Sequence, residues 1–291
     1  MRHFVKTAVA TAVVGAALVV AGTATAGIAN TKHNLGSSQI DKVNNNHTES
    51  TGEICIFCHT PHGGDTGAPV PLWNKVLTNS TFQTYDQLGT STLDAGITTI
   101  GSISLACLTC HDGTQAIDNI LNAPGSGGYD TTGGGDNGLA WDWSTAPRLD
   151  ANGIFDAGII TNIGTDLRND HPVSVQYGGG GVSINSLTGP LRDSDFNLPT
   201  QIGSDSRWYI ENTTMQLGTG TAGFDKWDFK LYTRTVSGGK FAGVAEPFVE
   251  CGSCHDPHLE TTTFLRIDPT TNPDGNQSNA GSRVCLTCHT K

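Results

Sequence analysis

Eight cysteines, spaced with great regularity, limit the folds open to this 291-residue chain. All of them lie in four copies of the pattern Cys-x-x-Cys-His, so none is left over. Two thiols at this spacing can form thioethers with the two vinyl groups of one haem, and the next histidine then lies under the iron. The pattern predicts four c-type haems attached through Cys55, Cys58, Cys107, Cys110, Cys251, Cys254, Cys285 and Cys288, with His59, His111, His255 and His289 as proximal iron ligands.

Two other uses of paired cysteines agree less well with this pattern. Exported proteins often contain disulfides, but a disulfide framework gives no reason for a histidine after every second cysteine. Paired Cys-x-x-Cys units also hold zinc, but two zinc sites would leave all four motif histidines unexplained. Covalent haem accounts for every residue of the pattern.

The remaining histidines decide whether the protein closes the far side of each iron. After residue 26 the chain has one methionine, Met215, and five histidines outside the four motifs. A second axial histidine leaves a haem at lower potential than an axial methionine does. His47 lies in an Asn-rich turn and is expected to face solvent. The four expected distal ligands of bis-His haems are therefore His33, His62, His171 and His258.

Two of these histidines recur in the same frame, Cys-x-x-Cys-His-x-Pro-His. A residue three positions after a proximal ligand cannot cross to the far face of its own haem, so it would ligate a neighbouring iron. Motifs two and four instead share Cys-Leu-Thr-Cys-His, which indicates two duplicated di-haem modules. As a hypothesis, His62 reaches the second haem and His258 the fourth, which leaves the first and third to His33 and His171.

The chain divides into segments with different compositions. The cysteine-free stretch between the modules has Gly-rich loops and little helical pattern. Trp227, Phe229 and Leu231 alternate with other residues as in a strand, and residues 237–240 are typical of a hairpin turn. Trp141, Trp143, Trp208 and Trp227 are expected in the core. The predicted segments are a signal peptide (1–26), an N-terminal arm (27–54), a first di-haem module (55–124), a loop and strand scaffold (125–250) and a second di-haem module (251–291).

These features predict a fold class and exclude some partners. We expect a multihaem cytochrome c of mostly coil, with short helices at the motifs and a few small antiparallel strands around a stack of four haems. Residues 1–26 carry two basic residues, an apolar run and a small-residue cleavage pattern. The rest has 14 strong bases against 27 acids, a net charge of −13, which excludes nucleic acid as a partner. No second apolar run is long enough to span a membrane.

Several blocks of the sequence resemble the tetrahaem outer-surface cytochromes of the OmcE type. The resemblance implies bis-His haems in a continuous stack and subunits that polymerise into extracellular cytochrome nanowires. It also implies that a histidine of the next subunit completes one haem in each subunit. The blocks are residues 31–35, 55–63, 71–74, 107–114, 169–173 and 251–258.

Two sequence positions suit such a head-to-tail contact. His33 lies near the predicted mature start and His289 lies in the last motif, and a heterologous contact of this kind gives an open filament. We therefore expect His33 to act across the subunit contact, although the same two segments could meet within one monomer.

The expected function is electron transfer to other redox cytochromes or extracellular acceptors, not enzyme catalysis. A soluble periplasmic tetrahaem shuttle is the alternative, and a multihaem reductase, which needs an open iron position, is a further one.

Overall fold

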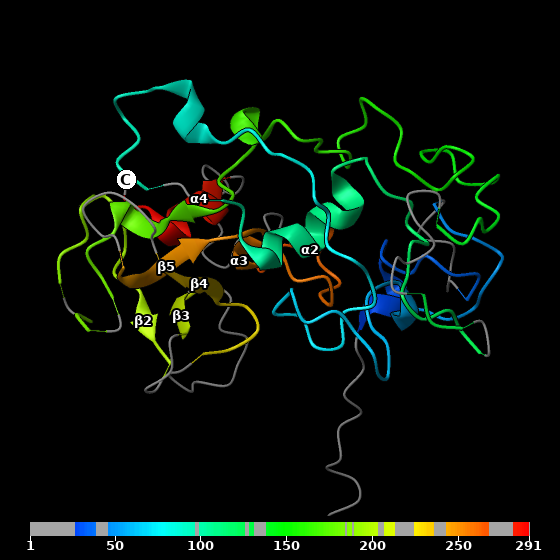
Figure 1. Cartoon of the computed structure of the whole chain (residues 1–291). Helices are drawn as coiled ribbons and strands as arrows, with labels where there is room; N and C mark the ends of the chain where they lie inside the picture. The colour runs from blue at the N-terminus through cyan, green and yellow to red at the C-terminus, as the bar shows by residue number, and fades with distance from the viewer. Residues whose placement is uncertain are drawn as a thin grey trace, which may run out of the picture.

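A computed structural model describes most of the chain outside its first 26 residues. Most of these residues lie in turns, bends and coil, and the regular elements are short (Figure 1). No helix in this part of the chain is long and apolar enough to cross a membrane. The expected signal peptide and Met215 lie outside the described residues, which are 27–38, 46–96, 99–125, 128–130, 138–183, 185–187, 189–202, 207–212, 224–235, 243–267 and 282–290.

Five short strands form one antiparallel sheet in the order β1-β5-β4-β3-β2 (Figure 1). Trp208 lies opposite Leu231 in the register of β3 and β4, and both side chains are buried. The alternation around Leu231 predicted a strand, which β4 confirms, although β4 begins after Trp227. The expected hairpin turn lies outside the described residues, but β4 and β5 do pair antiparallel. The strands are β1 (Val175–Gln176), β2 (Thr200–Gln201), β3 (Arg207–Ile210), β4 (Phe229–Thr235) and β5 (Ala245–Val249).

Helical turns coincide with the cysteine motifs, because a Cys-x-x-Cys spacing places both thiols on one side of a single turn. The longest helix, α2, lies in the middle of the molecule (Figure 1). In motifs one, three and four the amide of the histidine donates to the carbonyl of the first cysteine at 2.7–3.0 Å. The motif helices are η2 (Cys55–Phe57), α2 (Ser102–His111), α3 (Cys251–Cys254) and α4 (Arg283–Cys288).

The remaining helical elements are single 3₁₀ turns in the connecting loops. They are η1 (Gly27–Asn30), η3 (Tyr85–Leu88), η4 (Leu167–Asn169), η5 (Tyr177–Gly179) and η6 (Thr262–Phe264).

The buried apolar side chains fall into four clusters. One lies on the sheet around Trp208 and borders two motif cysteines. A second, around Trp143, borders Cys58, and each of the other two also borders a motif cysteine. Trp143 and Trp208 are fully buried, which confirms them as core residues. Trp141 and Trp227 are only partly buried and pack against these clusters.

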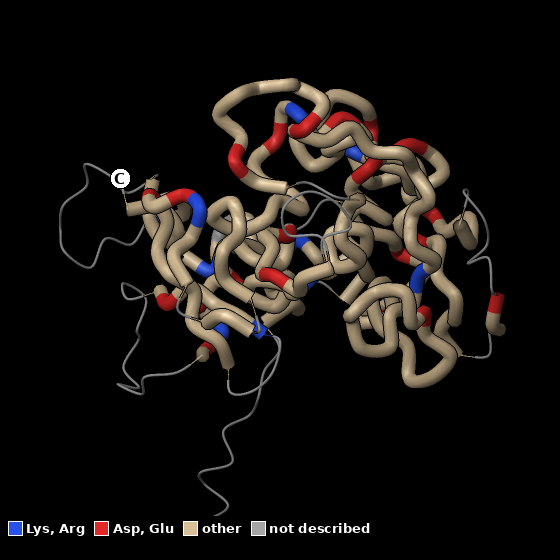
Figure 2. Tube along the Cα trace, turned by 60° about the vertical axis from the view of Figure 1, so that its left-hand side comes forward, with Lys and Arg blue, Asp and Glu red and all other residues tan. Residues whose placement is uncertain are grey.

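Charged residues are spread along the chain trace rather than gathered in one segment (Figure 2). The sequence has 27 acidic and 16 strongly basic residues. A few charges are buried instead. Lys75 is fully buried, and its amine donates to the carbonyls of Ile117 and Asn119 at 2.5 and 3.2 Å. Arg266 and Glu250 are also buried, and both lie close to the third cysteine motif.

Candidate metal centres

The structure brings three motif histidines into pairs with three histidines from other segments. The ring centroids are 6.2 Å apart in one pair, 6.3 Å in the second and 5.8 Å in the third. Each partner comes from a distant part of the sequence, so the pairs depend on the fold. The pairs are His59 with His258, His111 with His33, and His255 with His171.

These separations can be compared with the space that one metal ion needs. A ligating imidazole nitrogen lies about 2 Å from a first-row metal and about 1.1 Å from its own ring centroid. Two imidazoles on opposite sides of one metal therefore have centroids about 6.2 Å apart. Two pairs match this separation closely and the third is slightly narrower. The donor set, two neutral imidazoles, also suits iron.

Hydrogen bonds orient the motif histidine in all three pairs. In each, Nδ1 lies 2.7 Å from a backbone carbonyl oxygen. Such a bond places the proton on Nδ1 and leaves Nε2 free to bind a metal. The bonds run from His59 to Pro71, from His111 to Thr161 and from His255 to Thr263.

His33 is the most enclosed of the partner histidines. Its Nδ1 is buried and has no hydrogen-bond partner. Its ring stacks on Phe264, with centroids 4.1 Å apart and planes 9° apart. Burial lowers the pKa of His33 to about 3, and the neighbouring His111 adds to the shift. A buried, neutral ring with an unpartnered nitrogen, beside a second imidazole, suits a metal-ligand position.

His258 differs from the others because an acid contacts its ring. Its Nδ1 lies 3.1 Å from Oδ1 of Asp256, and this hydrogen bond raises the pKa of His258. The other oxygen of Asp256 pairs with buried Arg266. Burial opposes ionisation of Asp256, but the bond from His258 and the charge of Arg266 lower its pKa to about 2.

The fourth motif histidine has a different neighbour. The ring of His289 lies 4.1 Å from that of Phe196, and among the described residues no second imidazole faces it. His62 is exposed, and its ring is in none of the three pairs. The backbone of His62 is held in place, because its carbonyl oxygen accepts hydrogen bonds from the side chains of Asn122 and Thr60. His47 was expected to face solvent, but its side chain is only 18% exposed and its ring contacts Glu49 at 3.0 Å.

This pairing differs from the one expected from the sequence. His258 does face the proximal histidine of another motif, as its spacing required, but that motif is the first and not the fourth. His33 was expected to act between subunits, yet it lies beside His111 of its own chain. His171 lies beside His255 of the third motif, one of the two positions that the sequence left open to it. The hypothesis that His62 serves the second motif is wrong in this structure, because His33 lies beside His111. The two modules therefore interlock, since His258 of the second lies beside His59 of the first.

All eight motif cysteines are unbridged thiols, so the structure does not have the disulfide framework considered above. Burial raises the pKa of Cys58, Cys254 and Cys288 to about 12. Cys107 and Cys251, from motifs two and three, hydrogen-bond to each other, which raises the pKa of the first and lowers that of the second. Motifs two and three are therefore in direct contact. Within the described residues no cluster of three or more His, Cys, Asp or Glu could hold an ion by itself.

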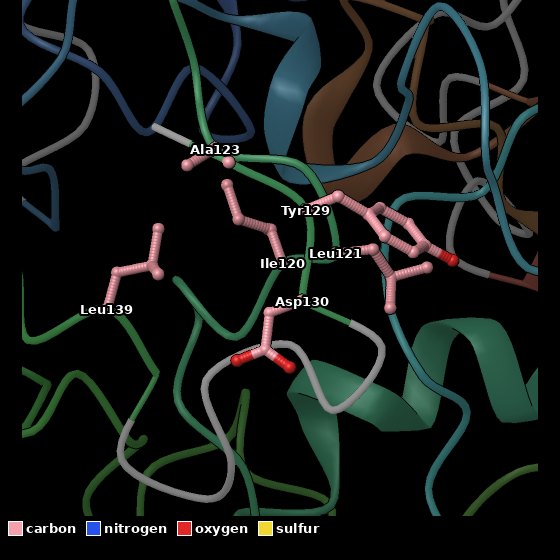
Figure 3. A pocket seen from close by; sticks show the side chains of 7 residues that line it. Ile120, Leu121, Ala123, Tyr129, Asp130 and Leu139 are labelled. Carbon is pink, nitrogen blue, oxygen red and sulfur yellow. The ribbon is translucent and has the colours of Figure 1, made fainter. Parts of the chain in front are cut away.

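One small cavity lies outside the histidine pairs. It has a volume of about 170 Å³ and is lined mainly by Ile120, Leu121, Tyr129, Asp130 and Leu139 (Figure 3). Sites for small organic ligands are usually about 300 Å³ or larger. The cavity lies near the His62 loop, because a side chain at Gly63 would meet the ring of Tyr129.

No protein-family model matches the chain, and a search of curated proteins finds no match either. The resemblance to the OmcE-type cytochromes therefore rests on the sequence motifs themselves.

Sequence reasoning missed Asp256 and Arg266. A signal for Asp256 was present, because the two Cys-His-x-Pro-His frames differ at the x position, which is Thr60 in one and Asp256 in the other. Arg266 gave no such signal, since it is close to Asp256 only in the folded chain.

Proposed function

We propose that this chain is an electron-transfer protein that holds four covalent c-type haems. The observation that carries the proposal is the set of three pairs, each joining a Cys-x-x-Cys-His histidine to a distant histidine at 5.8–6.3 Å. Haem iron supplies one-electron redox chemistry when bound. The unbridged cysteines would attach the four haems, and the apolar clusters that border these cysteines would pack against them.

The paired histidines would close both axial positions at three of the four sites. An iron with two imidazole ligands has no position left for a substrate, and its potential is low compared with an axial methionine. The carbonyl bonds to Nδ1 would hold each proximal ring in the orientation that directs Nε2 to the metal. These residues support transfer of electrons rather than conversion of a bound molecule.

Self-association supplies the fourth pair in this proposal. His289 and His62 are the motif histidine and the candidate ligand that the fold leaves unpaired, and His62 is exposed. His62 of one copy would ligate the iron held by His289 of the next. Such a contact is heterologous, so it produces an open filament unless the rotation closes a ring. An extracellular filament that passes electrons to external acceptors follows as the proposed assembly, with a periplasmic shuttle as the alternative.

Carbon monoxide binding tests the proposal, because this ligand requires an open position on ferrous iron. We expect the reduced monomer to bind carbon monoxide at one haem in four, and the filament at almost none. Binding at two or more haems in the monomer would contradict the three intrachain pairs. Electron microscopy of cell-surface material would show whether the filament exists.

A multihaem reductase is the second candidate, and the position of His289 favours it. An iron held by His289 with no second imidazole would keep a position open for substrate. A native assembly that still binds carbon monoxide at one haem per chain would favour the reductase over the conduit.

A further inference from the structure

Asp256 is held between a histidine ring and a buried arginine. Its Oδ1 accepts from the ring Nδ1 of His258 and from the amide of the same residue, both at 3.1 Å. Its Oδ2 lies 3.3 Å from Nη1 of Arg266. The two oxygens thus have separate partners, and the carboxylate is fixed in the direction of the imidazole.

Arg266 is itself anchored, so the carboxylate cannot turn away easily. Its side chain is 3% exposed. Its Nη1 donates to the carbonyl of Lys226 at 2.6 Å and its Nε to that of Gly252 at 3.3 Å. A buried arginine with its donors satisfied in this way keeps a single geometry.

Three other paired histidines have a hydrogen-bond acceptor at the ring Nδ1, and in each case that acceptor is uncharged. The Nδ1 atoms of His59, His111 and His255 all face backbone carbonyls. In the matching frame of the first motif, Thr60 stands where Asp256 stands in the third, and its hydroxyl donates to the carbonyl of His62 instead of contacting the ring. A charged acceptor on a paired imidazole is therefore specific to His258.

A carboxylate that accepts a hydrogen bond from an imidazole N–H makes the opposite nitrogen of the ring a stronger electron donor. Charge-assisted hydrogen bonds are roughly twice as strong as bonds between neutral groups. A stronger donor stabilises ferric iron over ferrous iron, which lowers the reduction potential.

We infer that Asp256 is a positioning residue that lowers the reduction potential of the haem held by His59 and His258. The inference rests on the proposed function. It makes this haem more reducing than it would be with a carbonyl acceptor, and so sets a step in potential along the electron path.

The test measures all four potentials by redox titration of the purified haem protein, together with its ferric electron paramagnetic resonance spectrum. Asp256→Asn removes the charged acceptor, and Asp256→Thr copies the Thr60 frame. In both variants we expect one potential to rise, with about a tenfold change in the oxidised-to-reduced ratio, or about 59 mV for one electron. One low-spin ferric signal should shift as well.

Asp170→Asn is the matched control. Asp170 precedes His171 of another pair, and its buried Oδ2 has no hydrogen-bond partner, so this change removes a nearby charge without changing a bond to an imidazole. It should move a potential without shifting a ferric signal.

Four outcomes would overturn the inference. An unchanged set of potentials in the Asp256 variants contradicts it. A potential shift without a spectral shift, as in the control, means that charge alone acts. Loss of one low-spin signal in both variants means that Asp256 only holds His258 in place. Purified protein that carries no covalent haem would overturn the proposed function as well as this inference. A measurement of haem content distinguishes this failure from the other three.

Discussion

Replacement of Glu250 should loosen the contact between the second and third cysteine motifs. Its carboxylate is fully buried and accepts from the hydroxyls of Ser104 and Ser174 at 2.5 and 2.7 Å. It also pairs with Arg234 at 3.2 Å. Ser104 lies on α2, and Ser174 lies just beyond the His171 segment. One side chain therefore joins two motif helices and a candidate ligand loop.

The structure gives a magnitude for Glu250→Ala. Removing one partner of a buried ion pair costs about 3–5 kcal/mol. For this pair the cost should be near the low end, about 3 kcal/mol, because Arg234 keeps a hydrogen bond to the Thr99 carbonyl. Each buried hydroxyl left without an acceptor adds about 1 kcal/mol or more. We expect a loss of about 5 kcal/mol in the free energy of unfolding. Glu250→Gln keeps the shape and an acceptor oxygen, so about 1–2 kcal/mol should be lost.

Urea unfolding of the haem-loaded protein, followed by circular dichroism, measures this loss. With a slope of about 3 kcal/mol per molar urea, the midpoint of Glu250→Ala should fall by about 1.7 M. Glu53→Ala is the control, because Glu53 is exposed, and it should change stability by less than about 0.5 kcal/mol. Equal midpoints for the Glu250 and Glu53 variants would refute the reasoning.

Three further predictions concern the ligand positions and the core. His62→Ala should leave monomers folded with four haems but abolish filaments in electron micrographs; intact filaments would remove His62 from the subunit contact. Gly153→Ala should lower the thermal midpoint more than Gly158→Ala, because both glycines have positive φ but only at Gly153 would a side chain meet Trp143; equal midpoints would contradict this. Burial lowers the pKa of His33 from 6.5 to about 3. As the pH falls, the unfolded chain therefore takes up this proton before the folded chain does. The free energy of unfolding, measured by urea titration at each pH, should be full above pH 6.5 and lower by up to about 2 kcal/mol at pH 5. A flat profile in that interval would show that His33 is not buried as a neutral ring.

The local features were predictable from sequence because they depend on neighbours in the chain. The motif turns follow from a spacing of three residues, and β4 follows from a two-residue alternation around Leu231. The buried Trp143 and Trp208 follow from their size and apolar character. These features need no knowledge of which segments meet.

The histidine pairing was not predictable, because it joins residues from distant segments. His258 comes close to His59 only after the two modules interlock, and His33 reaches His111 across a long loop. Spacing showed that His258 could not serve its own motif, but it could not name the partner. The roles of Asp256 and Arg266 depend on the same long-range contacts.

The intact mass of the denatured protein, purified from a host that attaches c-type haem, tests the central claim most directly. Thioether bonds survive unfolding, so the chain should retain the mass of four haems and contain no free thiols. A chain of unmodified mass, with eight free thiols or four disulfides, would contradict the account.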